Sequence, residues 1–181
     1  MSNSLHPIKE PFPEEIASLL AQYPTVDGYL LALFRTFANS QRFLEKGVPN
    51  LLDEESPLPL RVREIVILRV TANKNCEYEW GIHVAVFGHA AQLCETQIGA
   101  TRATEIEADL WPSEEYFLMV AIDELCAAGS ISDETLARFQ KDWTVEQQLE
   151  ILALCGTYHT VSFVANTARL PNEAFAATFP G

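Results

Sequence analysis

Residues 60–91 read LRVREIVILRVTANKNCEYEWGIHVAVFGHAA, two apolar segments that meet at the polar turn Asn73-Lys74-Asn75. The first segment, residues 60–70, contains no Gly or Pro and shows no strand-like alternation of apolar and polar residues. Pro59 stands just before it, where a first helical turn tolerates proline. The stretch therefore predicts a pair of helices joined by a short turn.

The second of these helices carries Cys76, Glu79 and His83 at positions i, i+3 and i+7. On an α-helix this spacing brings a thiol, a carboxylate and an imidazole onto one face over two turns. Imidazole is suited to proton transfer near neutral pH, because its ordinary pKa of about 6.5 is easily moved across that range. The three residues are candidates for acid–base chemistry.

Glu64 is the corresponding candidate on the first helix. Its neighbours on the helical surface are apolar, so its carboxylate is expected to be buried and to need a partner. The candidate partners are His83, Arg61, Arg63 and Arg69. From spacing alone, a structural hydrogen-bond network that joins the two helices explains Glu64, Glu79 and His83 as well as a catalytic site does.

The pattern of Glu64, then Cys76, Glu79 and His83, resembles the carboxymuconolactone decarboxylase family, which includes alkyl hydroperoxidase D-like (AhpD-like) proteins. The likeness extends over roughly residues 13–170. It implies an all-α, single-domain AhpD-like fold that assembles as a homo-oligomer, either a trimer or a hexamer. It also implies a small-molecule substrate.

The chain departs from the peroxidase members of that family, which carry a Cys-x-x-Cys motif. Glu79 occupies the position of the second cysteine, and Tyr78 stands where those peroxidases have a histidine. No dithiol can form within the motif. The decarboxylase branch is similar in another way, because it also places a glutamate four residues before the histidine, as Glu79 and His83 do here.

Three functional hypotheses follow. The leading one is a decarboxylase-like enzyme without metal or organic cofactor, in which His83 and Glu79 act as acid and base on a small oxygenated or carboxylated substrate and Glu64 orients the imidazole. The second is an alkyl hydroperoxidase with peroxiredoxin-type activity through Cys76, which would need an external thiol or Cys94 to resolve the sulfenic acid. The third is a non-catalytic oligomeric helical scaffold.

Three aromatic residues are candidates for substrate binding, although a single tryptophan before a helix, as Trp111 is, more often serves packing. They are Tyr78, Trp80 and Trp111.

Charge and composition narrow the possible partners. The 181 residues carry a formal net charge of −13, which opposes binding to nucleic acid or to an anionic membrane. We find no export signal and no apolar run long enough to span a bilayer, so the sequence predicts a soluble, cytoplasmic protein. The four cysteines are widely separated and form neither a disulfide framework nor a zinc signature.

Outside the central pair, residues 1–12 are expected to be an N-terminal arm, because three prolines lie at or near them, and residues 13–181 to form the helical domain. Ser113 is expected to cap a helix that runs to Ala128. Residues 145–170 are expected to form the last long helix, which is apolar around much of its circumference and thus suited to burial in the domain or at a subunit contact.

Overall fold

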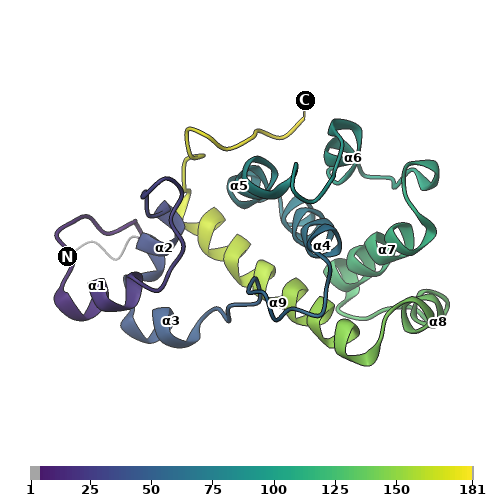
Figure 1. The fold of residues 1–181 in the computed structure, drawn as a ribbon, viewed down its shortest axis with the longest axis horizontal. Coiled ribbons are helices and arrows are strands. Elements are labelled where there is room, and N and C mark those ends of the chain that lie inside the picture. The colour runs from purple at the N-terminus through teal and green to yellow at the C-terminus, as the bar shows by residue number, and fades with distance from the viewer. Residues whose placement is uncertain (1–4, 181) are drawn as a thin grey trace.

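The computed structural model describes residues 5–180 of the chain, which form one all-α unit without a named strand (Figure 1). The first four residues of the expected arm and the last residue of the expected domain lie outside this range. The helices, in chain order, are α1 (Glu14–Leu20), α2 (Ala32–Phe37), α3 (Gln41–Lys46), α4 (Leu60–Asn73), α5 (Glu77–Phe87), α6 (Glu95–Ala100), the 3₁₀ turn η1 (Ala108–Leu110), α7 (Ser113–Ala128), α8 (Asp133–Asp142) and α9 (Val145–Ala168).

Helix α4 is the centre of the fold, in contact with α5, α7 and α9 (Figure 1). Because neighbours cover it on several sides, residues 65–68 and Val70 are fully buried, which explains why the helix is apolar around its circumference. Helices α1 to α3 form a smaller group on the other side of α9, and α2 contacts α9. No helix among the described residues is both long enough and apolar enough to cross a membrane.

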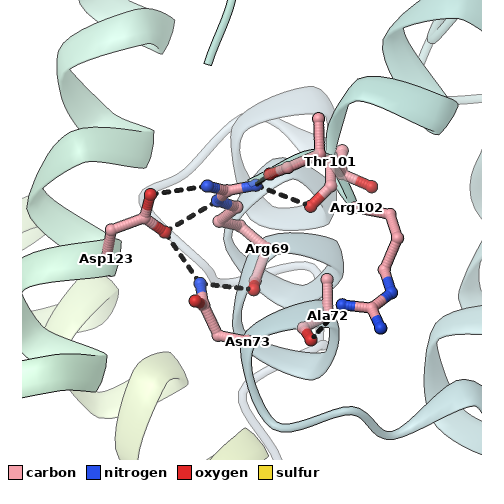
Figure 2. Close-up of polar contacts among 7 residues, drawn as sticks. Arg69, Ala72, Asn73, Thr101, Arg102 and Asp123 are labelled. Atoms are coloured by element: carbon pink, nitrogen blue, oxygen red, sulfur yellow. Dashed lines mark hydrogen bonds and ion pairs between the residues drawn. The ribbon is translucent and has the colours of Figure 1, made fainter. Parts of the chain in front are cut away.

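A buried arginine ties α4 to α7 and to the chain after α6 (Figure 2). The guanidinium of Arg69 donates two hydrogen bonds to the carboxylate of Asp123, at 2.7 and 2.5 Å, and two more to the carbonyls of Thr101 and Ala103, at 3.0 and 2.7 Å. Asn73 adds a donor to the same carboxylate at 2.7 Å. The charge of Arg69 is therefore fully engaged in holding the helices together.

The C-terminal segment after α9 lies against α5. The backbone N–H of Ala177 donates to the carbonyl of Gly81 at 3.0 Å, and the ring of Phe179 packs on Trp80 with centroids 5.2 Å apart. A Cβ on Gly81 would lie 2.0 Å from the carbonyl oxygen of Ala177. Glycine is thus required here by the close approach of the two backbones.

One expected helix start is wrong in detail. Pro112 occupies the N-cap position of α7, and Ser113 is the first helical residue. The hydroxyl of Ser113 instead accepts a hydrogen bond of 2.9 Å from Arg138 on α8. A tertiary contact has therefore taken the side chain that local sequence assigned to a cap. The longest helix, α9, does begin with a side-chain cap, because the hydroxyl of Thr144 accepts the N–H of Gln147.

Candidate functional site

Three helices bring one side chain each into a continuous line of hydrogen bonds. The imidazole of His83 on α5 lies between Glu64 on α4 and Tyr158 on α9. Its Nδ1 is 2.8 Å from a carboxylate oxygen of Glu64, and its Nε2 is 2.9 Å from the hydroxyl of Tyr158. All three side chains are buried. Both ring nitrogens of His83 are therefore engaged.

The turn between α4 and α5 makes this meeting possible. Asn75 adopts a left-handed backbone with φ of 51°, a conformation that Asn tolerates better than most residues. The N–H of Cys76 donates to the carbonyl of Thr71 at 2.9 Å, and the side chain of Asn166 on α9 donates to the carbonyl of Lys74. These bonds reverse the chain, so α5 runs back beside α4 and places His83 next to Glu64.

Burial and nearby carboxylates shift the pKa values of His83 and Tyr158. Burial lowers the pKa of His83, but the charge and hydrogen bond of Glu64 and the charge of Glu79 outweigh it, so the pKa is raised above its ordinary value. Burial, with the charges of Glu79 and Glu64, raises the pKa of Tyr158 well above its ordinary value. The phenol therefore keeps its proton. When His83 is neutral, the phenol O–H donates to Nε2 and Nδ1–H donates to Glu64, whereas in the protonated imidazole both ring N–H groups donate and the phenol oxygen accepts.

Glu79 is the second carboxylate near His83. Burial, together with the charges of Glu64 and Glu173 and against the favourable charge of His83, raises its pKa to about 7. One of its oxygens, Oε2, is buried without a hydrogen-bond partner among the described residues, and the same is true of Oε1 of Glu64. The site thus holds one carboxyl group that titrates near neutrality and two carboxyl oxygens with free capacity to accept a hydrogen bond.

Cys76 lies at the N-cap of α5 and is fully buried. Burial is the largest influence on its thiol and raises the pKa to about 11, and the charge of Glu79 adds to the increase. Cys94, the candidate resolving residue, is exposed at the start of α6, and both residues are free thiols. A thiol with so high a pKa holds little thiolate at neutral pH.

The three aromatic candidates are all buried. Tyr78 and Trp80 make hydrogen bonds to residues outside the cluster, and the indole nitrogen of Trp111 makes none within the described range. The hydroxyl of Tyr78 donates to Glu173 in the C-terminal segment at 2.7 Å and accepts the N–H of Leu33. The indole N–H of Trp80 donates to the hydroxyl of Thr101 at 3.0 Å. The indole nitrogen of Trp111 is buried without a partner among residues 5–180.

The three arginines that were candidate partners of Glu64 differ in the ion pairs and hydrogen bonds that they make. Arg61 forms a two-pronged ion pair with Glu115 at 2.6 and 2.9 Å, and Arg69 is engaged with Asp123 as described. Arg63 makes one hydrogen bond, from Nη1 to the carbonyl of Asp53 at 3.2 Å, and its Nε is buried without a partner within the described range. The charge of Arg63 also opposes protonation of His83, which places it within electrostatic reach of the imidazole.

Neither of two cavities on the surface of residues 5–180 is lined by Glu64, Glu79 or His83. One, of about 430 Å³, lies at the beginning of α5 and is lined by Glu77, Tyr78, Arg169 and their neighbours. The other, of about 510 Å³, lies around residues 89–94. Within residues 5–180 no three His, Cys, Asp or Glu side chains are grouped so as to hold a metal ion.

Tyr158 is a residue of the site that the sequence did not predict. Its neighbour His159 points elsewhere, with Nε2 3.3 Å from the sulfur of Cys126. The available signal was the helical register of α9, in which Ile151, Leu154, Tyr158 and Val161 form one buried face.

Comparison with known proteins supports the resemblance. A search of curated proteins finds no match to the chain. The model of the carboxymuconolactone decarboxylase family matches residues 41–123, a range that contains Glu64, Cys76, Glu79 and His83 but not Tyr158. The resemblance drawn from the motif is therefore confirmed over residues 41–123, where the chain is similar to the carboxymuconolactone decarboxylase family.

Proposed function

We propose that this protein is a carboxymuconolactone decarboxylase-like enzyme that uses Glu79 and His83 as acid and base on a small oxygenated or carboxylated substrate. The observation that carries the proposal is the hydrogen-bonded line from Glu64 through His83 to Tyr158, with Glu79 beside it. Paired titratable groups whose pKa values are moved by burial and by each other are typical of acid–base sites.

The proposed chemistry assigns one role to each group. Loss of CO2 breaks a carbon–carbon bond and leaves its electron pair on the remaining carbon, which must then take a proton. Glu79, with a pKa of about 7, is present in both protonation states near neutrality and can supply that proton. Glu64 and Tyr158 each hydrogen-bond one ring nitrogen of His83 and so fix the orientation of the imidazole.

Arg63 is the arginine best suited to hold a substrate carboxylate in this scheme. Its guanidinium has donors to spare, whereas Arg61 and Arg69 are committed to Glu115 and Asp123. A planar guanidinium recognises a carboxylate through two parallel hydrogen bonds, so a single weak contact leaves most of that capacity free.

The scaffold hypothesis is the second candidate, and one observation favours it. The side chains of Glu64, Glu79 and His83 are buried, and they line neither of the two cavities described above. In this alternative the polar line joins α4, α5 and α9 and nothing more. The peroxidase alternative receives less support, since the thiol of Cys76 is buried and its pKa is raised to about 11.

The test is turnover of carboxymuconolactone and of a small panel of related lactone acids, followed by the change in ultraviolet absorbance. His83→Gln and Glu79→Gln are each expected to lower kcat by about 100-fold or more, the usual contribution of a general acid or base. Glu77→Gln is the matched control on the same helix and should leave kcat unchanged. Unchanged turnover in His83→Gln would refute the acid–base proposal.

The same preparations distinguish the alternatives. Consumption of cumene hydroperoxide with dithiothreitol, lost in Cys76→Ser, would identify the peroxidase. Absence of turnover on every probe, together with a large loss of stability in His83→Gln, is the result that the scaffold hypothesis predicts.

A further inference from the structure

A second pair of reactive side chains lies outside the cluster around His83. Cys126 is on α7 and His159 is on α9, and Sγ of Cys126 is 3.3 Å from Nε2 of His159. Both side chains are half-buried, so the pair is within reach of solvent. A thiol within hydrogen-bond reach of an imidazole is the arrangement of an activated sulfur nucleophile.

The shared proton of this pair belongs to sulfur at neutral pH. Burial raises the pKa of the Cys126 thiol, and the charge of Asp123 adds to the increase. The charges of Lys74 and Arg69 act in the opposite direction. Burial, with the charge of Lys74, lowers the pKa of His159, so its imidazole is neutral. In the tautomer with its proton on Nδ1, His159 accepts the S–H through Nε2 and can take that proton when the sulfur attacks.

Lys74 supplies positive charge at the same place. It lies in the turn between α4 and α5, and its ammonium donates to the backbone carbonyl of Cys126 at 3.1 Å. The carbonyl of Lys74 accepts the side-chain amide of Asn166 on α9 at 2.9 Å, which ties the turn to α9. The ammonium is therefore held where its charge favours negative charge on sulfur. The other cation, Arg69, is committed to Asp123 (Figure 2).

The other three cysteines do not combine access with a base. Cys76 and Cys155 are buried, and burial raises the pKa of their thiols to about 11 and about 12. Cys94 is exposed. Within residues 5–180, Cys126 is the one cysteine whose sulfur is hydrogen-bonded to a histidine nitrogen.

We propose that Cys126, His159 and Lys74 form a modification site at which a small disulfide converts the thiol of Cys126 to a mixed disulfide. A bond forms between Sγ of Cys126 and one sulfur of the reagent R–S–S–R, and the S–S bond of the reagent breaks. The thiol proton passes to Nε2 of His159 and then to the departing sulfur, which leaves as R–SH with the electron pair of the broken bond. The sulfur of Cys126 is oxidised and the departing sulfur is reduced, so the disulfide is the only reactant required.

The groups around Cys126 match the needs of this reaction. Negative charge develops on the sulfurs during the exchange, and the departing sulfur needs a proton. Lys74 supplies positive charge, and His159 returns the proton once it has taken it. Because Cys126 is half-buried beside α9, a small disulfide reaches its sulfur more readily than a disulfide held in another folded protein. A mixed disulfide is a reversible cap, which a free thiol removes by the same exchange.

The experiment follows the reaction of the full chain with hydroxyethyl disulfide, a small uncharged disulfide, and measures the rate at each cysteine by mass spectrometry of its peptide. At pH 7 we expect Cys126 to react about tenfold or more faster than Cys94, although Cys94 is the more exposed residue. His159→Gln and His159→Asn should each slow the reaction of Cys126 about tenfold or more and leave the rate at Cys94 unchanged. His89→Gln is the matched control, because His89 is an exposed histidine on another part of the surface. It should leave the rate at Cys126 unchanged.

The pH dependence separates proton transfer from a merely structural contact and needs only the wild type. A thiol that reacts as free thiolate loses about tenfold in rate for each pH unit below its pKa, and Cys94 should slow by about that factor from pH 8 to pH 7. Cys126 should slow less than about threefold over the same interval, because neutral His159 takes the proton directly. In His159→Gln the steeper dependence should return.

Lys74→Gln should slow the reaction of Cys126 about threefold, because it removes the positive charge beside the sulfur. Three results would each overturn the proposal. They are modification of Cys94 with no reaction at Cys126, a wild-type rate at Cys126 that falls tenfold from pH 8 to pH 7, and an unchanged rate at Cys126 in both His159 variants.

Discussion

Replacing Glu79 by Gln should make the protein more stable at pH 8 and leave its stability nearly unchanged at pH 4. Burial raises the pKa of Glu79 from its ordinary value of 4.5 to about 7. Below pH 4.5 the carboxyl is protonated in both the folded and the unfolded state and contributes nothing. Between pH 4.5 and 7 the unfolded state loses its proton first, so the folded state becomes progressively less stable, and above pH 7 the loss is constant.

The size of the effect follows from the same values. A difference of 2.5 between the two pKa values, at 1.36 kcal/mol for each pH unit, gives about 3 kcal/mol at pH 8. Part of this is offset, because the charge of Glu79 also favours protonated His83. We therefore expect Glu79→Gln to raise the free energy of unfolding by about 1–3 kcal/mol at pH 8. The assay is urea denaturation of both proteins at unit intervals from pH 4 to pH 8.

Glu77 is the control, because it stands two residues away on α5 and titrates in the opposite direction. The N–H of Phe179 and the amide of Asn172 hydrogen-bond its carboxylate and lower its pKa. Its stabilising contribution is present above its unfolded pKa and lost as the pH falls through the folded value, so Glu77→Gln should lose stability above pH 5. The reasoning would be refuted if Glu79→Gln changed the free energy of unfolding by the same amount at every pH, or if the variant became less stable relative to the wild type as the pH rises.

Three further outcomes are expected. Gly81→Ala should release the C-terminal segment, because the new Cβ would lie 2.0 Å from a backbone carbonyl of that segment, and limited proteolysis with mass spectrometry should show cleavage there at a higher rate than in the wild type. Asp123→Asn should lower the free energy of unfolding by about 3 kcal/mol in denaturant titrations, because it leaves the buried charge of Arg69 without its counter-charge. Iodoacetamide at pH 8 should modify exposed Cys94 and leave Cys76 unmodified on the same timescale, and equal rates would restore the peroxidase alternative.

The parts of the site that are close in sequence could be predicted from the sequence. Glu64 and His83 belong to two consecutive helices joined by a three-residue turn, so helical periodicity and turn chemistry made His83 one of the four candidate partners of Glu64. The apolar surroundings of Glu64 correctly indicated a buried carboxylate with a partner. The same reasoning could not select among Arg61, Arg63 and Arg69.

The missing information was tertiary. Arg61 and Arg69 are committed to acids 54 residues away in the chain, and no local pattern specifies those pairs. Tyr158 reaches His83 across 75 residues. Ser113 was assigned to a cap by local preference, and a contact with Arg138 decided otherwise. In each case a long-range contact determined which of several locally acceptable roles the side chain has.

The contact between the C-terminal segment and α5 also affects when the protein can fold during its synthesis. The carboxylate of Glu173 accepts hydrogen bonds from the hydroxyl of Tyr78 and from the N–H of Ala32 at the start of α2. Domains generally fold as units as the chain emerges from the ribosome. Here α2 and α5 both leave the ribosome well before the acceptor that joins them. Residue 173 must therefore leave the ribosome before the carboxylate of Glu173 can join α2 to α5. Until then, the hydroxyl of Tyr78 lacks this hydrogen-bond acceptor.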